Sequence, residues 1–391
     1  MKSQSSSNYT MSPFEMSVAH VSFTVGAGIL TMPRALAIVL DSPFGWVSLI
    51  VSGLVTLLYI YLIVKLQGRM KNESLFDYVE RSNSLKWVGK VFSILFFVYF
   101  LAFFCIEGRI LASVVHIYLL DQTPLEVIFL LMLLATTYAC SKGVEGIVHI
   151  SLIYFPFLLL VLVIINLFNT GNFQVVEMRP VVGKEVVAAL NIRQVFYFFL
   201  GFEIFFFFLK YVNPITQTGK RQKKNHPLFI YFLGAGLIVL LKVSVVLFSY
   251  GVLTVEGTKV LPFPTIELSK EVELLEGLIE RLEPLVIVMW IMTIFNTMAI
   301  LQFIAADIFH SQWVPERNAN VVAFIFGILS FFLAFYPDSL TETLFFYEWV
   351  GYLGIVIITL FLATGLIVVR KNKRPLTGPP SSRDQGGDVN G

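Results

Sequence analysis

Charge is scarce in this chain of 391 residues. Only 14% of the residues are Asp, Glu, Lys or Arg, against about 25% in an ordinary soluble domain. Hydrophobic residues make up 57% of the chain, and the formal net charge is only +2. This composition excludes a soluble globular protein of this length, and no basic surface suited to nucleic acid is present. The chain is therefore predicted to be a polytopic membrane protein.

Motifs for catalysis and metal binding are also missing. The sequence contains no H-E-x-x-H, no G-x-S-x-G, no Walker A loop and no Cys/His cluster with metal-ligand spacing. Its two cysteines, Cys105 and Cys140, fall in different apolar segments. We expect them at different depths in the membrane, so a disulfide is not predicted. The sequence predicts no enzyme, no metal site and no cofactor.

What the chain has instead is a series of apolar runs, most of them near the length of about 20 residues that crosses a bilayer. They lie at about 14–39, 44–66, 88–119, 124–140, 147–168, 186–211, 227–253, 284–306, 319–336 and 347–369. Ten spans divide into two sets of five, and an odd number per set gives the halves opposite orientations, as in inverted-repeat transporters. We predict one transmembrane domain over residues 14–370, with repeats at about 14–168 and 186–370.

Lysine and arginine gather on one side of these spans, in the connections 65–90 and 210–226 and in the segment that begins at Arg370. The opposite connections hold mainly acids, namely Asp41, Asp121, Asp338 and Glu342. Because cytoplasmic loops concentrate Lys and Arg, both termini are predicted to be cytoplasmic. These termini are a polar segment, 1–13, and a tail, 371–391, whose Gly, Pro and Ser content predicts disorder.

Three connections are long enough to hold structure of their own, and one of them is residues 170–184 on the outer side, which include Arg179-Pro180. Residues 73–85 form a polar, weakly amphipathic stretch that we expect on the inner membrane surface. On the outer side, Pro262 and Pro264 end any helix, and residues 265–283 then show apolar positions at helical spacing. This last stretch predicts an interfacial helix outside the bilayer.

The first span contains the sequence V-G-A-G-I-L-T-M-P-R over residues 25–34. Gly26 and Gly28 lack a Cβ atom, so the chain can leave helical geometry here at little cost. Irregular backbone at membrane depth is tolerated where it lines a cavity or is buried in protein. The pair therefore indicates a broken helix at a binding cavity, although glycines at this spacing also allow close helix packing.

The sixth span holds the counterpart of this break if the halves are repeats. It reads F-F-L-G-F-E and places Gly201 next to Glu203. Interrupted helices at corresponding positions of two halves indicate a shared substrate site near the membrane midplane. This correspondence favours the cavity over simple close packing.

Ionisable residues at membrane depth cost at least about 2.5 kcal/mol each, so each calls for a partner or a water-filled cavity. Glu107, Arg109 and Lys242 are predicted to form an intramembrane charge network, with Glu107 or Glu203 as the counter-charge of Lys242. Glu107 and Lys242 could equally be interior pairs that only hold the bundle together. In the eighth span Asn296 and Thr297 are candidates either for the pocket or for interhelical hydrogen bonds.

Six segments taken in order carry a family resemblance. They are V-G-A-G-I-L-T-M-P-R-A-L at 25–36, E-S-L-F-D-Y at 73–78, M-R-P-V-V-G-K at 178–184, F-L-G-F-E at 199–203, F-P-T-I-E-L at 263–268 and I-E-R-L-E at 279–283. The set resembles the spore germination receptor B-subunit family, within the amino acid, polyamine and organocation transporter superfamily. The resemblance implies an all-α, LeuT-like fold of ten transmembrane helices with broken first and sixth helices. It also implies a germinant-sensing subunit in the inner membrane of an endospore, beside an A subunit and a lipoprotein C subunit.

The expected function is binding of a small nutrient, most simply an amino acid, between the broken helices. Its carboxylate would meet N–H groups near Gly26–Ile29, and its ammonium group the carbonyls of Phe199–Gly201 or Glu203. The alternative is a proton-coupled amino acid permease that carries its substrate across the membrane, with the proton on Glu203. Membrane lipid surrounds the protein in either case. The candidate ligand-binding residues are Val25, Gly26, Ala27, Gly28, Ile29, Tyr99, Phe103, Phe199, Leu200, Gly201, Glu203, Asn296 and Thr297.

Overall fold

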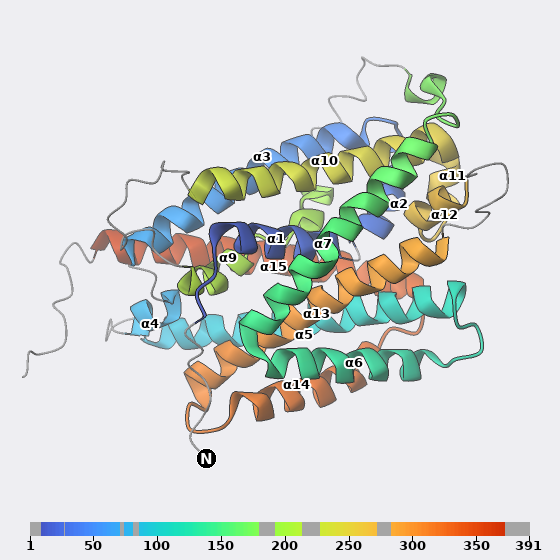
Figure 1. Cartoon of the computed structure of the whole chain (residues 1–391). Coiled ribbons are helices and arrows are strands. Elements are labelled where there is room, and N and C mark those ends of the chain that lie inside the picture. The colour runs from blue at the N-terminus through green and yellow to red at the C-terminus, as the bar shows by residue number, and fades with distance from the viewer. Residues whose placement is uncertain are drawn as a thin grey trace, which may run out of the picture.

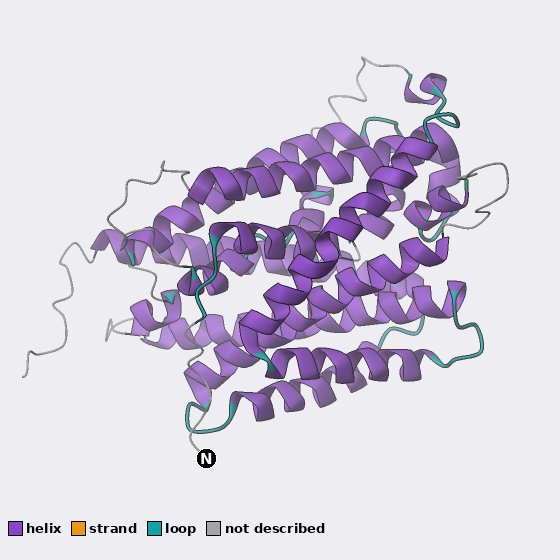
Figure 2. Cartoon of the chain, viewed as in Figure 1, coloured by secondary structure: helices purple, strands orange, loops and turns teal. Residues whose placement is uncertain are grey.

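The protein is seen in a computed structural model that describes residues 9–26, 28–70, 74–80, 86–179, 192–212, 227–271 and 283–371. Over these residues the regular elements are helices joined by loops and turns (Figure 2). Figure 1 shows α3 and α10 along one edge of the bundle and α6 and α14 along the other, with α5 and α13 between them. Most of the long helices run in similar directions, and α7 crosses the bundle obliquely (Figure 1).

Six helices of the described part are long and apolar enough to cross a membrane. Their bounds are α3 Gly45–Arg69, α5 Lys86–Tyr118, α7 Gly143–Phe168, α10 Pro227–Leu253, α13 Glu283–Trp313 and α15 Leu340–Lys371. Two shorter apolar helices, α6 (Leu125–Ser141) and α14 (Ala319–Ala334), pack against each other and against α5 and α13. Large apolar side chains on the outer faces, such as Leu131 and Phe332, are 63% and 74% exposed, as expected of surfaces that contact lipid.

The first and sixth predicted spans are both interrupted. The first consists of α1 (Pro13–Val25) and α2 (Gly28–Leu40), which are bent by 50° relative to each other. The sixth consists of short pieces, η2 (Ile192–Gln194), η3 (Phe196–Phe199), α9 (Ile204–Phe208) and η4 (Leu209–Tyr211). The start of the predicted sixth span lies outside the described residues. With the eight continuous helices, these two interrupted segments account for the ten predicted spans.

The connection at residues 73–85 is packed against the bundle. Its described part is α4 (Leu75–Glu80), and Leu75, Phe76 and Val79 on it are buried. The Phe76 ring centre lies 4.9 Å from that of Phe361 on α15. The apolar side chains of this turn complete the core between α5 and α15, while the location of the stretch on the inner membrane surface stays a prediction.

The connection between α10 and α13, predicted to lie on the outer side and called the outer connection below, is also packed against the bundle. Only the first part of the expected helix is described, as α12 (Pro264–Lys270), which follows a short helix α11 (Val255–Val260). Thr265, Ile266 and Leu268 are buried, and α12 packs on α2, α10 and α13. This part of the helix therefore packs on the protein, and its position relative to the membrane stays a prediction. Residues 272–282 lie outside the described residues.

Candidate functional site

The first break lies between α1 and α2, and residues at both ends of α1 set its limits. Ser12 and Glu15 form a capping box at the start of α1, with Pro13 in the first turn. At its other end α1 stops at Val25, and Gly26 takes the non-helical angles φ −11° and ψ −139°. Ala27 lies outside the described residues, and α2 begins at Gly28. The break leaves backbone groups without helical partners, and these must be satisfied by other elements.

Two of the backbone carbonyls at this break are satisfied by α13. The Thr297 hydroxyl donates to the Phe23 carbonyl at 3.2 Å, and the Trp290 indole N–H donates to the Gly26 carbonyl at 3.0 Å. Thr297 therefore reaches the first span, as one of its two predicted roles requires. All four residues are buried or belong to the buried break, so these bonds hold the end of α1 against the eighth span.

A third carbonyl is satisfied from the outer connection. Pro33 lies inside α2 and has no N–H, so the carbonyl four residues earlier, that of Ile29, loses its helical donor. The hydroxyl of Thr265 on α12 donates to this carbonyl at 2.8 Å. The outer helix α12 is thus bonded to the half-helix α2 one residue beyond the break.

The second break lies between η3 and α9 and is built around Gly201. Gly201 has φ +133°, and a Cβ atom there would lie 2.2 Å from the Thr24 hydroxyl oxygen. The Glu203 carboxylate folds back to accept the Gly201 N–H at 2.5 Å and also accepts the Tyr99 hydroxyl at 2.9 Å. Only glycine fits this close approach of the sixth span to the first.

Two charged side chains reach the breaks from other helices. Lys242 of α10, fully buried, donates from Nζ to the Phe198 carbonyl at 2.7 Å. A Cβ atom on Gly28 would lie 3.7 Å from Lys242 Nζ, and one on Gly26 would lie 3.2 Å from Glu107 Oε2. A cation and a carboxylate therefore lie beside the two glycines that open the first span.

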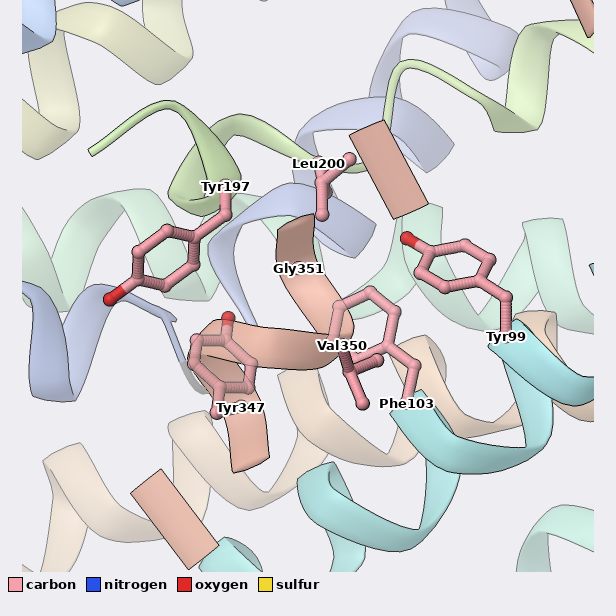
Figure 3. Close-up of a pocket in the computed structure, with 7 residues that line it drawn as sticks. All are labelled: Tyr99, Phe103, Tyr197, Leu200, Tyr347, Val350 and Gly351. Carbon is pink, nitrogen blue, oxygen red and sulfur yellow. The ribbon is translucent and has the colours of Figure 1, made fainter. Parts of the chain in front are cut away.

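An aromatic cavity lies next to the second break (Figure 3). It is lined by Tyr99, Phe103, Tyr197, Leu200, Tyr347, Val350 and Gly351, whose side chains leave no space that a water molecule could occupy. The lining residues come from α5, the sixth span and α15, and the Tyr347 ring lies between Tyr197 and Phe103. Because ligand pockets usually measure about 300 to 1,000 Å³, this conformation is closed, and a ligand can enter only when these rings move apart.

Most of the candidate residues meet in this region. Gly26, Gly28, Ile29, Phe199, Leu200, Gly201, Glu203, Tyr99, Phe103, Thr297, Glu107 and Lys242 line the breaks or the cavity. Val25 is buried at the end of α1.

Two candidates point elsewhere. Asn296 lies toward α7, where its Oδ1 accepts the Ser151 hydroxyl at 2.8 Å. Arg109 contacts the Phe335 ring, with the guanidinium carbon 4.8 Å from the ring centre. The structure thus does not bring Arg109 into one network with Glu107 and Lys242, because residues two apart on a helix face different ways.

The last span and Trp290 contribute to the site, although neither was predicted from the sequence. Tyr347 and Gly351 line the cavity, and a Cβ atom on Gly351 would lie 2.6 Å from the Tyr197 Cβ. The pair Gly351 and Gly354 was a usable signal, since small residues one turn apart mark a close helix approach. The aromatic residues gave no such signal in a chain with 38 Phe and 15 Tyr.

A metal site is not formed by the described side chains, among which no group of three or more His, Cys, Asp or Glu could hold an ion. The groups present at the breaks are carbonyls, N–H groups, one ammonium group and two carboxylates around aromatic rings. Such a site can hold a small zwitterion or polar molecule by its charges and enclose its apolar part.

Solved structures show the same fold. The chain is similar to MhsT, in a crystal structure with L-phenylalanine, with a TM-score of 0.65 and 14% identity, covering 94% of this chain and 90% of MhsT. It is also similar to Mhp1, a nucleobase-cation-symport-1 family transporter, with a TM-score of 0.63 and 12% identity over 93% of this chain and 78% of Mhp1. These likenesses confirm the LeuT-like fold with its interrupted first and sixth helices.

Sequence relatives lead to the family. Residues 10–343 match the family described as spore germination protein. Spore germination protein A2 of Bacillus subtilis is 30% identical over 354 residues, which cover 89% of this chain and 93% of that protein. Spore germination protein B2 of the same organism is 28% identical, covering 86% of this chain and 89% of that protein. The chain therefore belongs to the spore germination protein family and is an integral membrane protein with a LeuT-like, transporter-type fold.

Proposed function

We propose that this chain is the nutrient-sensing B subunit of a spore germinant receptor. In this proposal it lies in the inner membrane of the endospore with both termini on the spore core side, and it signals to an A subunit and a lipoprotein C subunit. It is a binding protein and not an enzyme. The observation that carries the proposal is the meeting of two helix breaks beside a closed aromatic cavity, in a chain whose relatives are spore germination proteins.

The proposed ligand is an amino acid. Its carboxylate would bind at the N-terminus of α2, where the first N–H groups and the helix dipole favour an anion, with the Lys242 ammonium group close to Gly28. Its ammonium group would bind Glu203 and the carbonyls of the second break, and its side chain would lie among the rings of the cavity. The complex of MhsT with L-phenylalanine supports this ligand class on the same fold.

The closed cavity suggests how binding becomes a signal. A ligand between the breaks has to separate Tyr347 on α15 from Tyr197 and Phe103, whose ring centres lie 5.8 and 6.0 Å from that of Tyr347. Binding then favours a state in which α15 and the outer helices α11 and α12 have moved. A ligand shifts such an equilibrium only by its difference in affinity for the two states, and the partner subunits would detect that difference.

Proteoliposomes that contain the purified chain test this function against the permease hypothesis. Tritiated amino acids are added one at a time, and bound and internalised label are measured with and without an inward proton gradient. If the chain is a sensor, it binds one amino acid saturably and does not accumulate it. Gly28→Val should abolish this binding. Gly236→Val is the control, because Gly236 lies in open space on α10, and it should retain binding. Accumulation driven by the gradient would show a proton-coupled permease, and saturable binding that Gly28→Val leaves unchanged would contradict the proposed pocket.

A further inference from the structure

A second cavity lies on a neighbouring face of α5. It has a volume of about 220 Å³ and lies between α5, the end of α14 and α15. Ala102, Cys105 and Arg109 line it from α5, and Leu333, Thr343 and Phe346 are among the residues on the other side. Val350 lines both cavities, so this one adjoins the aromatic cavity, but the residues of the helix breaks take no part in it.

Arg109 gives this cavity its chemistry. The residue is only 8% exposed, and its Nε has no hydrogen-bond partner. The guanidinium group packs on the Phe335 ring, and among the described residues no carboxylate forms a salt bridge with it. Glu126 and Asp338 are the acids whose charges act on it from a distance. A guanidinium group buried in this way is stabilised by an anion that brings its own acceptors.

The rest of the lining is apolar and opens toward the lipid. Val98, Leu333 and Tyr336 at its edge are 50%, 44% and 74% exposed on the outer face of the helix bundle. Arg109 lies nine residues before Tyr118, or about 13 Å along the helix at 1.5 Å per residue, and Tyr118 bonds to Glu267 on α12 at 2.7 Å. The cavity therefore lies toward the α12 end of the bundle, and its mouth is on the apolar outer face beside the loop that joins α14 to α15.

We propose that this cavity binds an amphiphile from the membrane that has an anionic head, a carboxylate or a phosphate, and an aliphatic chain. The head pairs with the Arg109 guanidinium group, and the first part of the chain occupies the apolar space around Ala102 and Phe346. The volume is smaller than the 300 to 1,000 Å³ or so of a typical ligand pocket, so the remainder of the chain extends past Val98 and Leu333 into the bilayer. This inference is independent of the nutrient proposed above.

Photolabelling of the full chain in a non-ionic detergent tests the proposal. The probe is a hexadecanoic acid with a diazirine in its chain, and the matched probe is the corresponding alcohol, which has no charge. Labelled peptides are mapped by mass spectrometry, and the probe concentration for half-maximal labelling is measured. We expect saturable labelling by the acid in the peptides that contain residues 98–109 and 333–350, and no saturable labelling there by the alcohol.

Variants test the contribution of the Arg109 charge and that of the cavity volume separately. Arg109→Gln should raise the half-maximal concentration of the acid by about tenfold or more, because a charge-assisted pair is lost. Arg317→Gln removes the same charge from a loop away from the cavity and should leave labelling unchanged. Ala102→Phe keeps Arg109 but fills the cavity, so it should block labelling, whereas Leu131→Phe on the lipid-facing side of α6 should not. Each variant is compared only if its unfolding midpoint matches that of the wild type.

Competition identifies the head group. Loss of labelling in the presence of excess phosphatidylglycerol, but not phosphatidylcholine, identifies an anionic lipid as an occupant. Competition by unlabelled hexadecanoate alone identifies a free carboxylate amphiphile, and both results support the site. Equal labelling by the acid and the alcohol, or labelling unaffected by both Arg109→Gln and Ala102→Phe, would overturn the proposal, because the cavity would then be an unspecific apolar crevice.

Discussion

The hydroxyl of Thr265 on α12 donates a 2.8 Å hydrogen bond to the carbonyl of Ile29 on α2. This is the carbonyl that Pro33 leaves without a helical donor. A proline inside a transmembrane half-helix is thus compensated by a side chain from an outer connection. The bond ties the outer helix to the segment that begins at the first break, so movement of one is coupled to movement of the other.

Replacement of Thr265 by valine tests this link. Valine keeps the shape of threonine but leaves the buried Ile29 carbonyl without a donor, at a cost of about 1 to 3 kcal/mol. We expect faster hydrogen–deuterium exchange in α12 and the first turns of α2, with the rest of the bundle unchanged. Thr364→Val is the matched control, because the Thr364 hydroxyl is exposed and bonds only within its own helix. Unchanged exchange in α12 would show that the bond does not hold the two helices together.

A second prediction concerns the charges at the breaks. Lys242→Met leaves the Phe198 carbonyl without its donor and removes the cation on which the Glu107 charge acts. Glu107→Gln removes the negative charge and leaves the Lys242 cation in place. An uncompensated buried charge costs about 3 kcal/mol or more, so each single variant should lower the unfolding midpoint of the purified protein. In the double variant the two losses should partly cancel, whereas strictly additive losses would show that the two side chains do not interact.

Gly201 provides a third prediction. Alanine at a φ of +133° is strained by about 1 to 3 kcal/mol, and its Cβ would lie 2.2 Å from the Thr24 hydroxyl oxygen. We expect Gly201→Ala to lower the unfolding midpoint and the amount of protein in the membrane, while Gly236→Ala behaves like the wild type. Adding Thr24→Ala removes the clash but not the backbone strain, so it should restore stability only in part. A stable Gly201→Ala protein would contradict this description of the second break.

A pH dependence follows from an ion pair outside the membrane. Lys259 on α11 donates a hydrogen bond to the Asp41 carboxylate, and this bond lowers the pKa of Asp41 below its ordinary value. Because the folded-state pKa is the lower one, the pair stabilises the protein above the ordinary Asp pKa of about 3.9. The stabilisation is lost as the pH falls through the lowered value.

Thermal unfolding of the wild type and of Asp41→Asn at several pH values checks this prediction. Asparagine suits the φ of +48° at this position, so the variant removes the charge and little else. The difference in unfolding midpoint should be small, present at pH 7, and absent in acid below the Asp41 pKa. A difference that stays constant with pH would show that the ion pair does not cause it.

The fold could be predicted because it follows from local properties of the sequence. Apolar runs of membrane length gave the spans, and Gly26 and Gly28 in one half and Gly201 in the other gave the two breaks. The repeat boundaries and the orientation of the termini stay predictions. The packing of the two connecting helices against the bundle was not predicted, since the burial of Phe76 and Thr265 depends on neighbours that are distant in the sequence.

The candidate site could be predicted only in part, for a similar reason. Backbone breaks are encoded by glycine, so the residues of the breaks were found. Two features were not found: the closing of the cavity by Tyr347 and the hydrogen bond that Trp290 donates. Both depend on how the helices are rotated about their axes. Helices that are hydrophobic all round carry no sequence pattern for that rotation. The same holds for Arg109, which was predicted to join Glu107 and Lys242 but contacts the Phe335 ring instead.

The central claim is that a nutrient binds between the two breaks, and germination of spores that carry Gly28→Val tests it most directly. A Cβ at this position lies 3.3 Å from the Tyr347 hydroxyl and 3.7 Å from Lys242 Nζ, so the valine methyl groups occupy the place of the ligand. Spores with Gly28→Val and spores with Gly236→Val are scored against a panel of single nutrients, with the protein level checked by immunoblot. We predict that Gly28→Val alone abolishes one nutrient response, or raises the nutrient concentration it needs by about tenfold or more, while the protein persists. Wild-type responses to every nutrient, with Gly28→Val protein present, would contradict the claim.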